Sequence, residues 1–430
     1  MKKVSFYIDN SNISSVNLSE ILIGNPGIGG TEYMLFLVAY LLSIRNNSIC
    51  VDLYLRKRQF LPVGMKFKIV DNLTMAIKES ECENTDLFVL KHDVENIKMD
   101  KLRSNSQMKF IVWCHVFACF WELDYYSKNS SVCKIVFVGR EMMDLYRDHR
   151  IFDKSVYIYN CLNFEGARKL VELNRYDKRR HIVTYVGSIV PFKGLHLLAE
   201  AWPDILRFVP DAELYIIGSG HLYDSSSELG SFGITEASYE SKIMKYLSKD
   251  GEILPSVHFM GIMGVEKREI FLKTKVGVPN PSGITETFCL SAVEMQAFGA
   301  RIATIVSPGY IDTVKNGILY KKRKRLVETV VRLLKSNNSD YNQAINYFEK
   351  EFAQEVVVEK WEELLHTGKL VNNHKLVNLW FRFKWLKELI RLVSMIIPLN
   401  FVIPPVERVL IFFERKILRR ITYMDSNLKL

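Results

Sequence analysis

The chain has 430 residues, of which 48% are hydrophobic and 12% aromatic, and its formal net charge is +10. This length predicts two or three domains with real cores, and the aromatic content with only 12 Pro and 22 Gly excludes disordered, collagen-like and low-complexity chains. The 7 cysteines are scattered without a C-x-x-C pair, which is typical of reduced thiols and argues against a disulfide framework or a zinc site.

The first 175 residues alternate short apolar runs with helical patterns. We predict strands at Val4–Ile8, Ile49–Leu55, Leu87–Leu90, Phe110–His115, Lys134–Val138 and Val156–Tyr159. Helices are predicted at Tyr33–Ile44 and Glu141–Arg147. Buried strands separated by helices indicate a parallel sheet that is covered on both faces.

A polar stretch, Leu173–His181, is typical of a linker, and the same alternation begins again after it. We predict strands at Ile182–Val186, Glu213–Ile217, Val257–Met260, Lys275–Val278 and Arg301–Ile305. The helices expected here are Gly194–Phe208, Gly264–Lys273 and Cys289–Phe298. The predicted fold class is therefore α/β with two successive doubly wound, Rossmann-like units. Ligands of such folds bind at the carboxyl ends of the strands, and here also between the units.

A glycine-rich segment, residues 25–32 (NPGIGGTE), precedes the first predicted helix. Glycines at a helix start let backbone N–H groups approach a phosphate, and the helix dipole favours its charge. Gly29 and Gly30 are therefore candidates for a phosphate-facing loop. An ordinary glycine-rich turn with Thr31 as the N-cap is the alternative, and this motif alone does not decide between them.

A lysine follows the first strand of the second half, in the segment 187–194 (GSIVPFKG). Lys193 stands at a turn between a strand and a helix, where a compact ammonium on a flexible stem suits a diphosphate. A solvated loop lysine is the alternative. The position at the carboxyl edge of a sheet favours the phosphate.

The segment 280–294 (NPSGITETFCLSAVE) leads into a predicted helix and contains two carboxylates. Glu286 and Glu294 are eight residues apart, and a helical rise of ~1.5 Å per residue predicts a separation of roughly 12 Å. That is too far for the ~5 Å carboxylate pair of a retaining glycosidase. It suits one elongated ligand with its phosphates on the amides of residues 287–289. The alternative is that Glu286 is favoured by the helix dipole and Glu294 is solvated.

Taken in order, these segments resemble glycosyltransferase family 4, a group of retaining, nucleotide-sugar-dependent enzymes with the two-domain GT-B fold. The resemblance rests on G-G-x-E, on K-G after a strand, and on P-S-x-x-x-E-x-F with E-x7-E. It covers about residues 1–366 and includes the segments 210–220 and 257–261. The stretch around Trp361 is similar to the family's helix that crosses back to the first domain.

The resemblance implies a role for each matching residue. Glu286 would contact the donor sugar at the reacting end. His115, at the end of a predicted strand, would lie near the donor sugar and the acceptor, although a core histidine is its alternative. These two are the expected catalytic residues. Lys193 would neutralise the phosphates, and Glu294 would bind the ribose hydroxyls. The full set of expected substrate-binding residues is Gly29, Gly30, Lys193, Thr287, Phe288, Cys289 and Glu294.

Two residues depart from the family pattern. Ser188 stands where Arg is usual, and Cys289 where Gly is common. Loss of the Arg removes a bidentate phosphate contact, which suggests a catalytically inactive scaffold of a polysaccharide-assembly complex as an alternative. The retained Lys193, Glu286 and Glu294 favour an active enzyme. Family members generally need no metal, so we expect no metal and no cofactor besides the nucleotide-sugar co-substrate.

The last segment, residues 374–430, carries eleven Lys and Arg against four Asp and Glu, a net of +7. Between Trp380 and Ile397 apolar residues alternate with Lys384, Lys387 and Arg391. Basic amphipathic helices with aromatics bind anionic bilayers in the plane of the surface. A helical pair packed on the body or on a second subunit is the alternative.

A second basic run, residues 321–325 (KKRKR), is expected to be a solvated face, and we expect no nucleic-acid partner. No uncharged apolar stretch reaches the ~20 residues of a spanning helix. The run before Asp9 is also too short for a signal-peptide core. We therefore expect a cytoplasmic protein, peripheral on the inner face of the membrane.

Four parts of the chain are expected. Residues 1–175 form an acceptor-side Rossmann-like domain, and residues 176–350 form a Rossmann-like domain that binds the nucleotide sugar. Residues 351–369 form the helix that crosses back, and 370–430 form the basic tail. The expected function is retaining transfer of a sugar to a glycan or lipid-linked acceptor in cell-surface polysaccharide synthesis.

Overall fold

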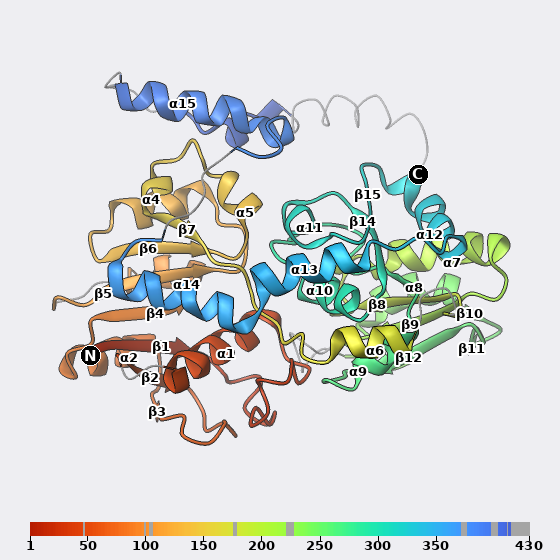
Figure 1. The fold of residues 1–430 in the computed structure, drawn as a ribbon, viewed down its shortest axis with the longest axis horizontal. Helices are drawn as coiled ribbons and strands as arrows, with labels where there is room; N and C mark the ends of the chain where they lie inside the picture. The colour runs from red at the N-terminus through yellow and green to blue at the C-terminus, as the bar shows by residue number, and fades with distance from the viewer. Residues whose placement is uncertain are drawn as a thin grey trace.

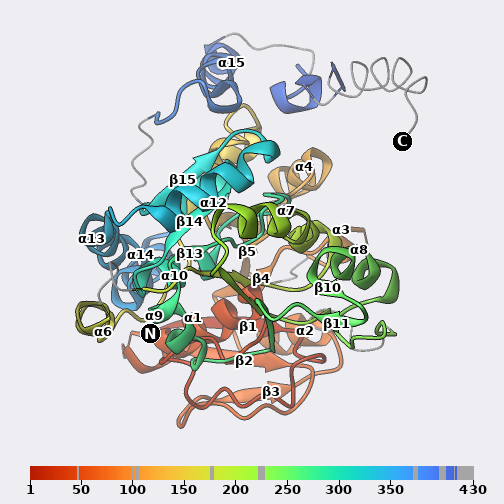
Figure 2. The ribbon, with the colours of Figure 1, turned by 90° about the vertical axis from the view of Figure 1, so that its right-hand side faces the viewer.

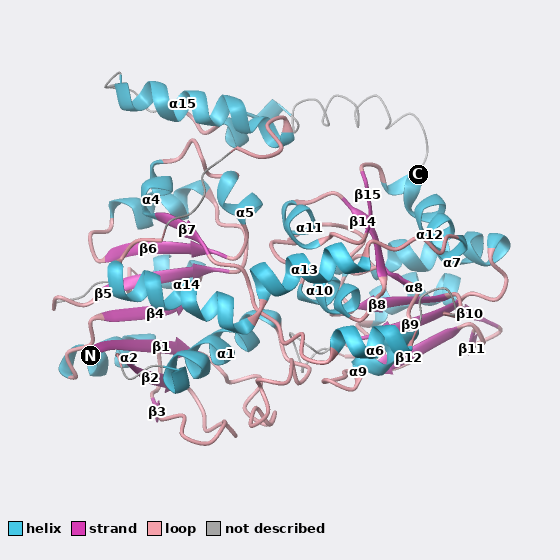
Figure 3. Ribbon diagram, viewed as in Figure 1, coloured by secondary structure: helices cyan, strands magenta, loops and turns pink. Residues whose placement is uncertain are grey.

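The computed structural model describes residues 1–45, 48–98, 100–102, 106–174, 179–220, 228–370, 376–396, 403–410 and 412–413. Two large parallel sheets lie side by side, each with helices packed on it (Figures 1 and 3). The predicted fold class, two doubly wound α/β units, is confirmed.

The first sheet has seven strands in the order β3-β2-β1-β4-β5-β6-β7, and all of them are parallel. These strands are β1 (Lys2–Ile8), β2 (Ile49–Leu55), β3 (Phe67–Ile69), β4 (Leu87–Lys91), β5 (Lys109–Cys114), β6 (Val132–Phe137) and β7 (Ser155–Tyr157). The helices are α1 (Gly30–Arg45), α2 (Leu73–Cys82), α3 (Val94–Lys98), α4 (Phe120–Lys128), α5 (Arg140–Asp144) and α6 (Ala167–Leu173). The strand order reverses between β1 and β4, which opens a crevice at their carboxyl ends.

The second sheet has six strands in the order β12-β9-β8-β13-β14-β15, again all parallel. They are β8 (Ile182–Val186), β9 (Glu213–Ile217), β12 (Val257–Gly261), β13 (Val276–Gly277), β14 (Arg301–Ile305) and β15 (Gly317–Tyr320). The helices are α7 (Leu195–Phe208), α8 (Ala237–Leu247), α9 (Lys267–Lys273), α10 (Leu290–Ala297), α11 (Pro308–Thr313) and α12 (Leu326–Lys335). A small antiparallel pair, β10 (Ser248–Lys249) and β11 (Glu252–Ile253), lies outside it. Here the order reverses between β8 and β13.

The strands form where the sequence is continuously apolar. In β4 the first four side chains are buried, as expected of a strand with helices on both faces. Four predicted strands, those now labelled β2, β8, β9 and β14, have the predicted bounds. The helix predicted at Glu141–Arg147 is wrong in length, because α5 ends at Asp144.

Two consecutive helices return the chain to the first sheet (Figure 1). They are α13 (Tyr341–Phe352) and α14 (Gln354–Thr367). On α14 the indole of Trp361 lies 4.6 Å from that of Trp113 on β5, between ring centroids. Arg45 at the end of α1 pairs with Glu359 at 2.5 Å. Helix α14 therefore packs on the first unit, although it follows the second sheet in the sequence.

The tail contains one described helix of 13 residues, α15 (Lys384–Ile396), which lies beyond α4 and α5 at one end of the molecule (Figures 1 and 2). Lys384 on this helix is 1% exposed in its side chain and pairs with Glu141 at 2.7 Å and Asp144 at 3.1 Å. Lys387 is also fully buried and pairs with Glu407 at 3.0 Å. Within the described ranges, no helix is both long and apolar enough to cross a bilayer.

Two of the basic residues counted in the tail, Lys384 and Lys387, therefore pack on the body as in the alternative interpretation, and binding of residues 374–430 to an anionic membrane stays a prediction. Both ammonium groups point into the body, where they pair with buried carboxylates of α5 and of residue 407. The predicted contributions of residues 375, 415, 416, 419, 420 and 429 lie outside the described residues.

We expect Lys384→Met to lower the free energy of unfolding by about 3 kcal/mol, because Glu141 would stay buried without its cation and Asp144 would keep only Arg147. Urea unfolding followed by far-UV circular dichroism measures the change. Arg325→Met is the control, since Arg325 pairs with Glu328 on an exposed helix start. An equal shift of the unfolding midpoint for both variants would contradict the buried ion pair.

Candidate active site

A cavity of about 830 Å³ lies between the two sheets. Its walls come from the glycine-rich segment, the ends of β4 and β5, the loop after β8 and the segment before α10. These are the carboxyl ends at both reversals of strand order, where doubly wound folds bind ligands. All nine residues predicted for the site line this cavity: Gly29, Gly30, His115, Lys193, Glu286, Thr287, Phe288, Cys289 and Glu294.

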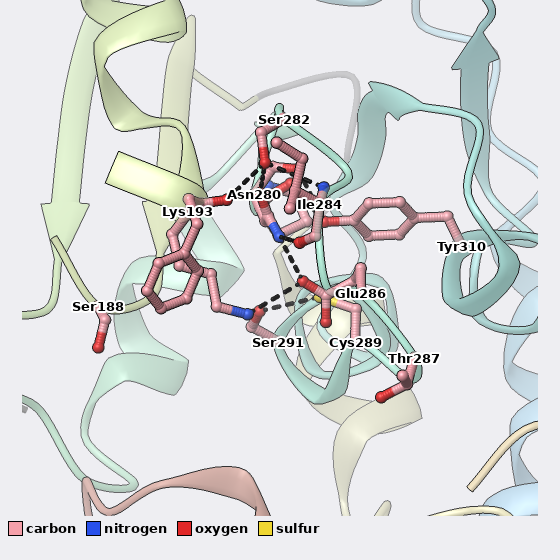
Figure 4. A network of polar contacts seen from close by, with 12 residues as sticks. Ser188, Lys193, Asn280, Ser282, Ile284, Glu286, Thr287, Cys289, Ser291 and Tyr310 are labelled. Atoms are coloured by element: carbon pink, nitrogen blue, oxygen red, sulfur yellow. Dashed lines mark hydrogen bonds and ion pairs between the residues drawn. The ribbon is translucent and has the colours of Figure 1, made fainter. Parts of the chain in front are cut away.

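Lys193 and Glu286 form an ion pair at one wall of the cavity (Figure 4). The Nζ of Lys193 lies 3.2 Å from Oε2 of Glu286, and the amide of Asn280 donates to the same oxygen at 2.8 Å. Asn280 is itself fixed, since its Oδ1 accepts a hydrogen bond from Ser282 at 2.6 Å. The carboxylate is therefore held by a cation and by a buried amide.

The backbone of the segment before α10 is unusual. The backbone of Asn280 has φ +28° and that of Thr285 has φ +61°, and residues other than glycine seldom adopt a positive φ. Gly283, with φ +65°, completes the turn. The N–H of Gly309 on α11 then donates to the carbonyl of Glu286 at 3.1 Å. This strained turn aims Glu286 at the cavity, and strain of this kind is concentrated at functional sites.

Glu294 lies on α10 and is mostly buried. Its carboxylate pairs with Lys267 of α9 at 3.3 Å, and Lys267 also lines the cavity. The expectation that a continuous helix separates Glu286 from Glu294 is wrong, because α10 begins only at Leu290. The two carboxylates still face one cavity, each beside its own lysine.

The glycine-rich segment approaches the second sheet closely. A Cβ on Gly30 would lie 3.0 Å from Leu290 at the start of α10. Because α1 begins at Gly30, Thr31 stands inside the first turn and is not the N-cap. Glu32 of the same turn pairs with Lys91 at the end of β4, at 3.0 Å. Lys91 also lines the cavity.

Thr287 and Phe288 join the two halves of the molecule. The hydroxyl of Thr287 donates to the backbone carbonyl of His115 at 2.6 Å. The ring of Phe288 packs against Tyr159 and Phe352, with centroids 5.9 Å and 5.1 Å apart. The side chains of these two predicted substrate-binding residues therefore make interdomain contacts, so only their backbone amides remain candidates for a ligand.

His115 is buried beside Trp113, and burial, together with the charge of Lys91, lowers the pKa of its imidazole to about 3. Its ring is therefore neutral at physiological pH. Three buried polar atoms of cavity-lining residues have no hydrogen-bond partner within the described chain: Nε2 of His115, Oδ1 of Asn160 and Oγ of Ser188. Buried polar groups are normally paired, so three unpaired ones around one cavity indicate a polar ligand.

Both departures from the family pattern, Ser188 and Cys289, line the cavity. Among the described residues that line it, Lys91, Lys193 and Lys267 are the lysines, and no arginine is present. Ser188, which stands where the family pattern has Arg, is buried at the cavity wall. Burial raises the pKa of the Cys289 thiol to about 12, which leaves this residue uncharged and unsuited to act as a nucleophile.

Sequence reasoning missed Asn160, Lys91 and Lys267. Asn160 and Lys91 follow apolar strands without a motif, and Lys267 begins a short helix with ordinary surface composition. Strand-end position was the one available signal for Lys91.

Residues 169–351 match the family model described as glycosyl transferases group 1. An uncharacterized glycosyltransferase of Haemophilus influenzae is 23% identical over 397 residues, which is 85% of this chain and all of that protein. Together with the fold, these findings support the group 1 glycosyltransferase superfamily. Membership of family 4 in particular stays a prediction.

Solved structures agree on the fold. The sucrose-phosphate synthase of Thermosynechococcus elongatus has a TM-score of 0.61 at 14% identity, covering 85% of this chain and 98% of its own. A glycosyltransferase of Rickettsia africae has a TM-score of 0.60 at 12% identity, with 85% and 97% covered. HepE of Anabaena, solved in complex with UDP, has a TM-score of 0.57 at 12% identity, with 85% and 100% covered. The chain therefore has the GT-B fold of glycosyltransferases.

For this glycosyltransferase fold we expect Lys193→Ala to weaken binding of a nucleoside diphosphate by roughly 10- to 150-fold, the value of a charge-assisted contact. Binding of the matching nucleoside should change little, since only the phosphates carry the charge. Calorimetry with both ligands measures this, with the exposed Lys335→Ala as control. Equal losses for both ligands would place Lys193 away from the phosphates.

The neutral His115 predicts a pH dependence of stability. Below pH ~6.5 the unfolded chain binds a proton at this residue, whereas the folded chain does so only near pH 3. Stability should therefore fall as pH decreases through this window. Between pH 7.5 and 5, the free energy of unfolding of His115→Gln should fall by up to about 2 kcal/mol less than that of wild type. Urea midpoints at both pH values test this, and an unchanged pH dependence would contradict the neutral buried ring.

Proposed function

We propose that the chain is a retaining, metal-independent glycosyltransferase. It transfers a sugar from a nucleotide-sugar donor to a glycan or lipid-linked acceptor in cell-surface polysaccharide synthesis. The observation that carries the proposal is the convergence of Lys193, Glu286, Glu294 and His115 on one cavity between two Rossmann-like units. Membership of family 4 is part of the same proposal.

The donor would lie across the start of α10. Lys193 would bind the diphosphate, and Glu294 would bind the ribose hydroxyls from the far end of the cavity. Glu286 would contact the transferred sugar, with Gly29 and Gly30 closing over it from the first unit. The presence of two separate lysine–glutamate pairs in one cavity supports this arrangement.

In this reaction the bond between the anomeric carbon and the diphosphate breaks, the acceptor hydroxyl oxygen takes its place on the same face, and the proton of that hydroxyl passes to an oxygen of the departing diphosphate. The departing diphosphate develops negative charge, which the ammonium of Lys193 offsets. Positioning and electrostatic stabilisation then supply the acceleration. The neutral ring of His115 suits a hydrogen-bonding role near the sugar and not that of a fixed cation.

Relatives with the same fold support the two substrate classes. HepE was solved with UDP, a nucleoside diphosphate. A lipopolysaccharide outer core galactosyltransferase, WaaB, has a TM-score of 0.54 at 13% identity. We propose by the same reasoning that the chain acts at the inner face of the cell membrane, as a peripheral protein.

An inactive scaffold is the second candidate, and Ser188 in place of Arg favours it. The unpaired polar atoms of His115, Asn160 and Ser188 favour a cavity that still binds a ligand. Calorimetric screening of the full chain against a panel of nucleotides and nucleotide sugars separates the two. Binding followed by transfer or hydrolysis supports the enzyme, and the absence of both supports the scaffold.

We expect Glu286→Ala to reduce transfer at least tenfold, about 1.4 kcal/mol in barrier, while the melting temperature stays near wild type. The loss follows because Glu286 is held toward the cavity by Lys193 and Asn280. Turnover with the donor found in the screen measures it, and the exposed Glu328→Ala serves as control. More than a tenth of the wild-type rate would exclude Glu286 from the reacting end.

A further inference from the structure

Helix α15 turns its apolar side away from the protein. The outward residues recur at helical spacing along one stripe, and Leu389 and Ile396 are 51% and 78% exposed. A helix on a water-facing surface normally shows the reverse, with its apolar stripe toward the core. The stripe consists of Trp385, Leu389, Leu392, Val393 and Ile396.

Ion pairs fix this orientation. The opposite side of α15 presents Lys384 and Lys387, whose buried ammonium groups pair with carboxylates of α5 and with Glu407. Glu388 on the same side pairs with the buried Arg147 at 2.8 Å. Rolling the helix to bury its apolar stripe would separate all of these charges, at a large cost in free energy. The apolar stripe is therefore held outward by the fold.

Exposed apolar side chains also occur in the segments that flank α15 in the sequence. Trp380, which precedes it, is 80% exposed. Residues 406–410 form a short helical segment that is anchored by a hydrogen bond from the N–H of Val406 to Asp148, at 2.6 Å. The further exposed apolar side chains are those of Phe383, Ile403, Val409, Phe412 and Phe413. We call this whole set, together with Trp380 and the stripe of α15, the tail face.

We propose that the tail face binds a lipid bilayer by inserting its apolar side chains, with α15 lying in the plane of the surface. This inference deepens the membrane association proposed above and rests on it. Attachment is then driven by apolar burial, whereas the lysines of α15 serve to hold the helix on the protein.

Two observations favour a bilayer over other occupants. The tail face is rich in Trp and Phe, the residues that anchor proteins at a membrane interface. The segment 374–430 carries a net +7 in the sequence, of which the buried Lys384 and Lys387 account for two, and the remaining positive charge complements anionic headgroups and opposes pairing with the same segment of a second copy.

The position of the helix agrees with this occupant. In Figure 1 α15 is the outermost element at its end of the molecule, beyond α4 and α5 of the first unit, and in Figure 2 it again lies at the edge of the molecule. This is the unit that we propose binds the acceptor. A bilayer at the tail face would therefore lie against the unit that we propose binds the acceptor.

Flotation of the full chain with vesicles tests the inference. The vesicles contain either phosphatidylcholine alone or phosphatidylcholine with phosphatidylglycerol, at low salt and at about 0.5 M NaCl, where charges are strongly screened. The variant is Leu389→Glu with Leu392→Glu, and the control is Val63→Glu, which is 97% exposed on the first unit. We expect wild type and control to float with anionic vesicles at both salt concentrations, and the double variant to partition roughly tenfold less or worse.

Each of the following outcomes overturns the inference. Wild type that stays in solution at low salt has no membrane-binding tail face. A double variant that floats like wild type, or flotation lost completely at high salt, assigns binding to charges elsewhere. A dimer of wild type that becomes monomeric in the double variant, seen by light scattering, makes a second copy the occupant. Flotation uses no sugar donor, so its failure is distinguishable from a failure of transfer.

Discussion

The contact between Thr287 and His115 is the constraint on which the site depends. It joins the segment that leads into α10, on the second unit, to the end of β5 on the first. Phe288 continues the joint by packing on Tyr159 and Phe352. Because Glu286 is the preceding residue, its carboxylate is fixed relative to both units. The consecutive residues Glu286, Thr287 and Phe288 thus form both the joint between the units and one wall of the cavity.

Much of this architecture was predictable from local sequence. Buried parallel strands are continuous apolar runs, so strands such as β2 and β8 could be placed to the residue. The approximate position of Lys193 followed from the same rule, since residues after a strand lie at the carboxyl edge of the sheet. The family resemblance then connected segments that are up to about 260 residues apart in the chain.

The remaining features of the site depend on contacts that sequence spacing does not encode. Lys267 became a cavity residue because α9 packs beside α10 and brings it within 3.3 Å of Glu294. Lys91 likewise meets Glu32 across 59 positions. The strained backbone at Asn280 and Thr285 has no local signature either, because neither residue is a glycine.

The orientation of the tail helix also depends on contacts that sequence spacing does not encode. Its amphipathic pattern correctly predicted a helix, but a pattern only states that two faces differ. The direction of each face was decided by Glu141 and Asp144, which lie about 240 residues earlier in the sequence. Buried carboxylates need a cation, and the lysine side of α15 supplies it. The apolar side was therefore left outward.

Helix α5 is where these parts of the molecule meet. The buried carboxylate of Asp312, from α11 of the second unit, accepts a hydrogen bond from the N–H of Glu141 at 2.9 Å. Burial and the charge of Glu141 raise the pKa of Asp312 to about 7. Gly139, which precedes α5, leaves room for the carbonyl of Thr287, since a Cβ there would lie 3.1 Å from it. The side chain of Glu141 pairs with Lys384 of the tail. One short helix thus contacts the tail, the second unit and the joint beside Glu286, so the placement of the tail and the geometry of the cleft depend on the same few buried charges.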